Sequence, residues 1–162
     1  MIVVVDYGVN NLKSVVRALG AGGHAATLTA DPGVVRRAER LLVPGVGNFG
    51  QAAANLATTG LGPAIREVVA SGRPVMGICL GMQLFFARSE EAPDHAGMGL
   101  LDGTVRRFRT TLPVPHVGWA GVQLTAAGRQ HPMLRDFFRD AVLYFYHVHS
   151  YHPADLAPGV AL

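Results

Sequence analysis

The sequence has one cysteine, one lysine and few charges of either sign. Charged residues make up 15% of its 162 residues. A single cysteine excludes an internal disulfide, which is typical of a protein from a reducing compartment. No apolar run approaches the roughly 20 residues that a membrane-spanning helix needs, and residues 1–6 lack the charged start and cleavage site of a signal peptide. These absences predict a cytoplasmic protein without a membrane partner.

The net charge of +3 is carried almost wholly by arginine. Its densest group, Arg106, Arg107 and Arg109, does not alternate with aromatic residues. We interpret this group as a solvated strand edge and expect no nucleic-acid partner. Apolar residues reach 49%, which excludes a disordered chain. The length fits a single domain over residues 1–162, and the chain shows no repeat or linker.

Strand and helix patterns alternate through the first half of the chain. Short apolar runs predict four strands, at residues 2–5, 25–29, 41–43 and 75–78. Apolar residues at helical spacing predict helices at residues 12–19, 48–56, 61–70 and 80–87. This alternation predicts an α/β fold with a mostly parallel sheet covered on both faces.

The pattern changes after Arg88. Residues 89–99 are polar and loop-like, and the later residues predict an antiparallel extension of the same sheet: strands at 104–108, 117–124 and 142–148, with a short helix at 133–138. Prolines and glycine after Tyr151 predict a loop. A doubly wound domain rarely ends on such a loop. We therefore expect the chain to be incomplete at its C-terminus, without a last strand and helix.

The cysteine lies in the pattern Gly77-Ile78-Cys79-Leu80-Gly81, between a β-branched run and a helix-forming one. This is the sequence form of a nucleophile elbow, a sharp strand-to-helix turn that exposes one side chain above a sheet. A helix N-terminus beside a thiol also favours the thiolate. Taken alone, the pattern fits a small buried hydrophobic residue equally well.

A second loop favours the catalytic interpretation. Pro44-Gly45-Val46-Gly47 follows the third predicted strand, and parallel strands release their loops at one edge of the sheet. The Leu80 amide and an amide of the glycine loop could then face one oxygen. Two such donors form an oxyanion hole for acyl chemistry, worth about 3–4 kcal/mol per donor.

A thiolate that attacks an amide also needs a histidine as base and acid. The sequence has seven histidines, and none stands out: His24 and His95 are predicted in loops, and His131 at a helix start. His147 and His149 share one strand face and could bind a metal ion, but without nearby carboxylates or a second cysteine the site would be weak. A structural or interface role fits them better. The others are His116 and His152.

Five segments, in this order, resemble the glutaminase subunits of imidazole glycerol phosphate synthase, which are class I, triad-type glutamine amidotransferases. The segments are Asp6-Tyr7-Gly8-Val9-Asn10-Asn11, Pro44 to Gly50, Gly77 to Gln83, Pro115-His116-Val117-Gly118-Trp119 and Val148-His149-Ser150-Tyr151. The resemblance covers residues 1–151. It implies a flavodoxin-like, doubly wound three-layer sandwich that hydrolyses glutamine to glutamate and ammonia through a thioester on Cys79.

The resemblance also implies roles for other residues. Leu80 and the loop of Gly45, Val46 and Gly47 would supply the oxyanion donors, while Gln83, Ser150 and Tyr151 would hold L-glutamine. The ammonia would pass to a cyclase subunit, which is a (β/α)8 barrel, in a heterodimer. That subunit makes imidazole glycerol phosphate and an aminoimidazole carboxamide ribotide in histidine biosynthesis. No cofactor or metal is implied. The face toward the cyclase would include Asn10, Asn11, Trp119 and Tyr146.

The sequence departs from the family pattern in three ways, at two positions and by the absence of one segment. Asn10 stands where the family has glycine, and asparagine tolerates the left-handed backbone of such a turn. Ala120 replaces the asparagine that follows the tryptophan. The family's catalytic histidine and glutamate belong to a late His-Pro-Glu segment, which residues 1–162 do not contain; His152-Pro153-Ala154 repeats only its beginning.

Two other functions compete with an active glutaminase. An inactive protein could retain the elbow and the partner face without turnover. Alternatively, Cys79 could be a redox or general hydrolytic thiol. The expected loss of a last strand would uncover apolar surface on the sheet, so we also predict aggregation or dimerisation unless another chain covers that edge.

Overall fold

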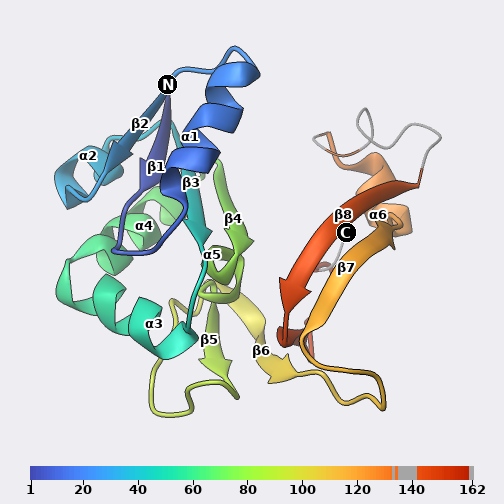
Figure 1. Cartoon of the computed structure of the whole chain (residues 1–162). Helices are drawn as coiled ribbons and strands as arrows, with labels where there is room; N and C mark the ends of the chain where they lie inside the picture. Colours follow the sequence, from blue (N-terminus) through green and yellow to red (C-terminus); the bar gives the residue numbers. More distant parts are fainter. Residues whose placement is uncertain (133, 135–141, 161–162) are drawn as a thin grey trace.

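A computed structural model describes residues 1–132, 134 and 142–160. Its largest sheet is parallel and has the strand order β2-β1-β3-β4 (Figure 1). The strands are β1 (Ile2–Val5), β2 (Ala26–Thr29), β3 (Arg40–Gly45) and β4 (Val75–Cys79). All four predicted strands are therefore confirmed, although β3 extends two residues beyond its prediction to include Pro44 and Gly45.

Helices cover both faces of this sheet (Figure 1). The described residues contain α1 (Leu12–Ala21), α2 (Pro32–Arg36), α3 (Phe49–Thr58), α4 (Leu61–Ala70), α5 (Leu80–Gln83) and α6 (Ala126–Gln130). Alternate residues of β1 and β3 pack against α2, α3 and α4 in the main hydrophobic core, while α1 lies over the opposite face. The α/β fold with a parallel central sheet is confirmed.

The second half of the described chain forms two smaller sheets. In the first, β5 (Phe86–Ser89) is parallel to β6 (Leu101–Arg107), which is antiparallel to β9 (Tyr151–Ala154). In the second, β7 (His116–Val122) pairs only with β8 (Leu143–His149), antiparallel. The predicted extension of the central sheet is therefore wrong, because these strands form sheets of their own (Figure 1).

The helix predicted at residues 80–87 is correct only in its first half. The helix α5 ends at Gln83, and the chain enters β5 at Phe86, whose side chain is buried and whose backbone pairs with Leu101. Leucine, phenylalanine and methionine at this point satisfy a helical pattern equally well. The strand forms because Phe86 is buried in the main hydrophobic core, and tertiary packing overrides local propensity.

The predicted loop after Tyr151 is only partly correct, because residues 151–154 form β9 while residues 155–160 are bends, turns and irregular backbone. Proline is tolerated in β9 because β9 is an edge strand, with β6 as its neighbour on one side. His131 follows the end of α6, whereas the sequence predicts it at a helix start. The predicted helix at residues 133–138 lies almost wholly outside the described residues. Over the described part of the chain, no helix has the length and apolarity to cross a membrane.

Candidate active site

Cys79 occupies a strained turn between β4 and α5. Its backbone has φ 54° and ψ −116°, a conformation that residues with a Cβ rarely adopt, and its side chain is exposed. Gly77 is required because a Cβ there would lie 2.6 Å from the Met82 Cα. At Gly81, a Cβ would overlap the Val43 carbonyl oxygen. The Gly-x-Cys-x-Gly spacing therefore reflects two backbone contacts that no side chain permits.

The loop after β3 lies beside this cysteine. Gly45 is the direct partner of Cys79 in the parallel register of β3 and β4. After it, Val46 is partly exposed, and Gly47 has φ +128° with open space where a Cβ would point. A backbone that is free on one side can bring an N–H close to a bound oxygen. The structure thus places the two predicted oxyanion segments next to each other.

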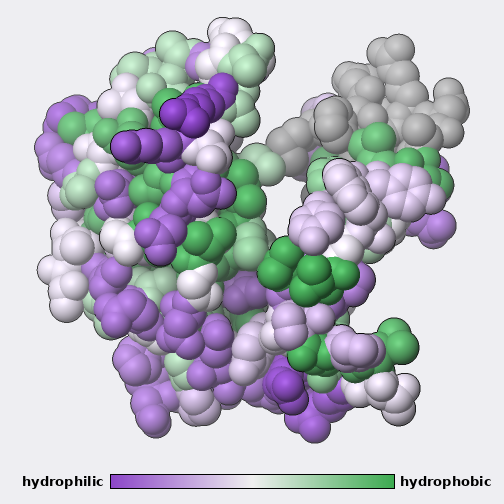
Figure 2. Space-filling model, in the orientation of Figure 1, coloured by the Kyte–Doolittle hydropathy of each residue, from purple (hydrophilic) through white to green (hydrophobic). Residues whose placement is uncertain are grey.

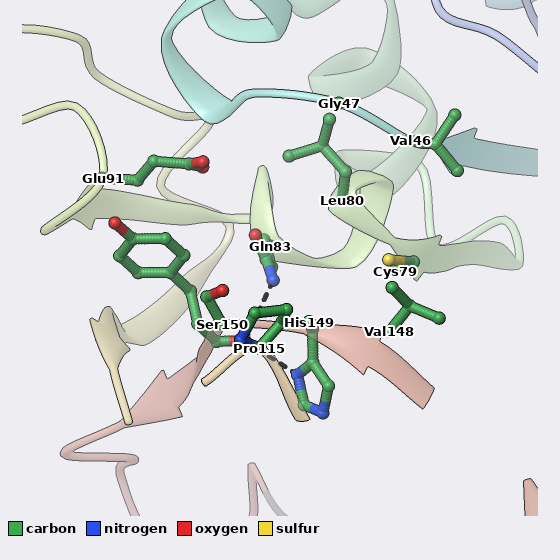
Figure 3. A pocket seen from close by; sticks show the side chains of 11 residues that line it. Val46, Gly47, Cys79, Leu80, Gln83, Glu91, Pro115, Val148, His149 and Ser150 are labelled. Carbon is green, nitrogen blue, oxygen red and sulfur yellow. Dashed lines mark hydrogen bonds between the residues drawn. The ribbon is translucent and has the colours of Figure 1, made fainter. Parts of the chain in front are cut away.

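A cavity of about 370 Å³ opens at this edge. Figure 3 shows its lining, with Cys79 on one wall and the end of β8 on the opposite wall. It brings together seven of the eight predicted site residues, while Gly45 lies behind the wall as the partner of Cys79. The lining residues are Val46, Gly47, Cys79, Leu80, Gln83, Glu91, Pro115, Val148, His149, Ser150 and Tyr151.

Hydrogen bonds join the two walls of the cavity. Gln83 is buried, and its Nε2 donates to the Tyr151 carbonyl oxygen at 3.2 Å. The Nδ1 of His149 lies 2.9 Å from the same oxygen (Figure 3). The side chain of Gln83 therefore fixes the position of Tyr151 relative to α5, and the two predicted substrate-binding segments act as one unit.

Glu91 is a lining residue that the sequence pattern did not single out. Its Oε2 accepts a hydrogen bond from the Phe49 amide at 2.9 Å, at the N-terminus of α3. Among the described residues that line the cavity, it is the only carboxylate. Residues 89–99 have the composition of a solvated loop, so no local signal separates Glu91 from its neighbours; only the fold brings it to the cavity.

Among the described residues, no side chain hydrogen-bonds the Cys79 thiol. The ring of His149 points away from the sulfur (Figure 3). His152 stacks on Phe108, with ring centroids 4.7 Å apart, and its Nδ1 lies 2.9 Å from the Pro153 carbonyl oxygen. Within the same described ranges, no three His, Cys, Asp or Glu side chains form a cluster that could hold a metal ion.

The predicted partner-face residues lie in two separate regions, the β7–β8 sheet and the turn before α1. Trp119 and Tyr146 are cross-strand partners on β7 and β8, with ring centroids 5.6 Å apart, and Trp119 is 70% exposed. Figure 2 shows further apolar surface on this two-stranded sheet. Asn10 and Asn11 precede α1, and Asn11, rather than Asn10, has the left-handed backbone, with φ 66°.

Comparisons with known proteins agree with this architecture. The family model described as Glutamine amidotransferase class-I matches residues 3–160. A solved structure described as a glutamine amidotransferase superimposes with a TM-score of 0.71 at 18% identity, over 97% of this chain and 76% of that one. The structure of a putative GMP synthase protein from Thermoplasma acidophilum gives 0.64 at 17% identity, over 97% and 68%. These two structures show the fold.

Relatives found by sequence share more identical residues with this chain than these two structures do. The subunit HisH of imidazole glycerol phosphate synthase from Symbiobacterium thermophilum is 43% identical over 161 residues, which cover 99% of this chain and 74% of the relative. The HisH subunit from Moorella thermoacetica is 44% identical over 154 residues, covering 93% and 70%. This chain therefore belongs to the class I glutamine amidotransferases, in the branch of the HisH subunits of imidazole glycerol phosphate synthase.

Proposed function

We propose that this chain is a glutaminase subunit that hydrolyses L-glutamine and delivers the ammonia to a cyclase subunit in histidine biosynthesis. The observation that carries the proposal is the strained, exposed Cys79 at the wall of a cavity whose lining also includes Leu80 and Gly47. Membership of the HisH branch supplies the substrate and the partner. The family membership does not favour the alternative of an inactive binding protein.

The geometry supports the following chemistry. The Cys79 thiolate attacks the side-chain carbonyl carbon of glutamine, a carbon–sulfur bond forms, and the carbonyl oxygen takes up the negative charge. The amides of Leu80 and of the loop Gly45–Gly47 would donate hydrogen bonds to that oxygen, where each donor is worth about 3–4 kcal/mol. The carbon–nitrogen bond then breaks, and the nitrogen leaves as ammonia after it gains a proton. Water hydrolyses the thioester to glutamate and restores the thiol.

Charge and hydrogen bonding at the cavity suit the other end of the substrate. The carboxylate of Glu91 could accept hydrogen bonds from the α-ammonium group of glutamine, a charge-assisted pairing stronger than a neutral one. Ser150 and Tyr151 contribute the opposite wall, and Gln83 holds that wall in place. A glycine at position 47 leaves room for the substrate to approach the backbone.

We assign no residue of this chain as the general base that transfers the proton. The family resemblance places the base and its orienting glutamate in a His-Pro-Glu segment, which does not occur in residues 1–162. Residues 1–162 would form a single amidotransferase domain that acts in the cytoplasm. Its partner would be a (β/α)8-barrel cyclase, and we propose no nucleic-acid partner. Trp119 and Tyr146 would face that barrel.

The test is glutamate release from L-glutamine by the chain together with its cyclase subunit. The proposal expects release that is lost when Cys79 is replaced by serine, while binding of the cyclase persists. No glutamate release by the wild-type complex, together with intact cyclase binding, would support the inactive binding protein instead. Labelling of Cys79 by a glutamine analogue, blocked by excess glutamine, separates a glutaminase from a general redox or hydrolytic thiol.

A further inference from the structure

The phenol of Tyr7 has no part in the function proposed above, although it lies directly behind the active-site loop. Its side chain is fully buried, and its hydroxyl donates a hydrogen bond of 2.7 Å to the Pro44 carbonyl oxygen. Pro44 is the residue before Gly45, the sheet partner of Cys79. The two bonded residues lie 37 positions apart in the chain, so this contact is a feature of the fold and not of a local turn.

The hydrogen bond takes the place of a strand pairing that β1 does not provide at the end of β3. The pairing of β1 with β3 stops at Leu42, whereas the pairing of β3 with β4 continues to Gly45 and Cys79. The last residues of β3 thus project beyond β1 and have a strand neighbour on one side only. A buried carbonyl without a partner costs free energy, and the Tyr7 hydroxyl satisfies the carbonyl of Pro44 at that position.

The contact also divides the loop into a fixed and a free part. At Gly45, a Cβ would collide with the Tyr7 hydroxyl, so phenol and backbone are in direct contact. Immediately beyond, Val46 is partly exposed, and a Cβ at Gly47 would meet no atom within 4 Å. The fixed part ends at the residue beside the nucleophile, and the peptide groups that could donate to an oxyanion follow directly.

We infer that Tyr7 is a positioning residue, which holds the Pro44–Gly45 end of β3 beside Cys79 so that the following amides meet the oxyanion. The inference rests on the proposed function, since it assigns a task in acyl transfer. Burial, and to a smaller extent the nearby Cys79 thiolate, raises the pKa of Tyr7 well above its usual value. The phenol therefore remains a hydrogen-bond donor throughout the physiological pH range.

Two electrophiles separate positioning from thiol reactivity, using the full chain and its single cysteine. Iodoacetamide alkylates the thiolate by displacement of iodide at a saturated carbon, so no oxyanion forms. With p-nitrophenyl acetate, the sulfur bonds to the acetyl carbon, an oxyanion forms, and p-nitrophenolate leaves as the carbon–oxygen bond breaks. The ratio of the acylation rate to the alkylation rate therefore separates stabilisation of the oxyanion from the general reactivity of the thiol.

The test variant is Tyr7→Phe, and Tyr144→Phe is the matched control, because Tyr144 is exposed on β8. We expect Tyr7→Phe to lower the acylation-to-alkylation ratio about 10- to 100-fold, the size of effect that misplaced catalytic groups produce. In the cyclase complex, kcat for glutamate release should fall by a similar factor with little change in KM. The control should match the wild type in the acylation-to-alkylation ratio.

An unchanged ratio in Tyr7→Phe would overturn the inference, whatever the glutaminase assay shows. Conversely, a wild-type complex that releases no glutamate would overturn the proposed function, while the ratio would still decide the role of Tyr7. If Tyr7→Phe lowers both rates equally, the phenol affects the general reactivity of the thiol and not the oxyanion site, and the inference fails. Urea unfolding of both variants shows whether each is folded under the assay conditions.

Discussion

The backbone of Gly81 lies directly against the carbonyl oxygen of Val43, so close that no side chain fits between the elbow helix and β3. This contact sets how sharply the chain turns after Cys79. Gly81→Ala would force the two backbones apart and should destabilise the protein by about 3 kcal/mol, at the upper end of overpacking effects. Urea unfolding measures the change, and the glutaminase assay should show lost turnover.

Gly20 provides the control for that substitution. It lies within α1, and a Cβ there would meet no atom within 4 Å. Gly20→Ala should stabilise the protein by about 0.5–1 kcal/mol, because alanine loses less backbone entropy than glycine in a helix. If both alanine variants changed stability in the same direction, the contact between Gly81 and Val43 would not be the cause.

The elbow can be predicted from the sequence because the residues that produce it are close together in the chain. Glycines on both sides of Cys79, an apolar run before it and a change of periodicity after it all lie within about ten residues, the window over which such patterns act. The short helix α2 also has local signals, which the predicted helices did not include: Asp31 accepts a hydrogen bond from the Gly33 amide at 2.7 Å as the helix cap, and Pro32 is its first residue.

Elements that depend on distant partners could not be predicted in this way. Phe86 becomes a strand residue because it pairs with Leu101 and joins the common core, and β9 forms because Val105 offers an edge to Pro153. Glu91 reaches the cavity for the same kind of reason, through the Phe49 amide forty-two residues away. Local composition contains none of these pairings.

The close approach of Tyr7 and Gly45 predicts that substitutions at the two positions are not additive. Gly45→Ala alone should be strongly destabilising, since its Cβ collides with the phenolic oxygen. In the Tyr7→Phe background the nearest remaining atom would be the Gly81 amide nitrogen at 3.1 Å, so the same change should cost about 1 kcal/mol less. Urea unfolding of the four proteins measures this coupling, and strict additivity would contradict it.

The raised pKa of Tyr7 leads us to expect that the free energy of unfolding falls at alkaline pH. Burial raises the pKa of the folded-state phenol above 10.0, its ordinary value, which the unfolded chain retains. Below about pH 10 both states keep the proton. Above it only the unfolded chain releases the proton, so the folded state is disfavoured by up to about 1.4 kcal/mol for each further pH unit.

Tyr7→Phe removes this titration. Its free energy of unfolding should therefore fall less between about pH 9 and about pH 11, the range around the ordinary tyrosine pKa, than that of the wild type, whereas Tyr144→Phe should follow the wild type. The measurement is urea unfolding at each pH, followed by circular dichroism. Parallel alkaline losses in Tyr7→Phe and in the wild type would show that the phenol ionises equally in both states.

The outer edge of β4 predicts self-association of the 162-residue chain. In the described part of the structure β4 is the last strand of its sheet, and on it Met76 is 50% and Ile78 39% exposed. An unpaired edge with apolar side chains can pair with the same edge of another molecule. A lysine on such an edge opposes that pairing, so Met76→Lys should shift the chain toward monomer in light scattering.

Leu112→Lys is the matched control for the edge variant. It introduces the same charge at a loop position, where the leucine is 72% exposed and belongs to no strand. If general solubility were responsible, both lysine variants would reduce association equally. If the β4 edge is responsible, only Met76→Lys should do so. Added cyclase should leave this difference in place, because β4 is not part of the proposed partner face, which includes Asn10, Asn11, Trp119 and Tyr146. A monomeric wild-type chain at every concentration would show that the edge does not drive association.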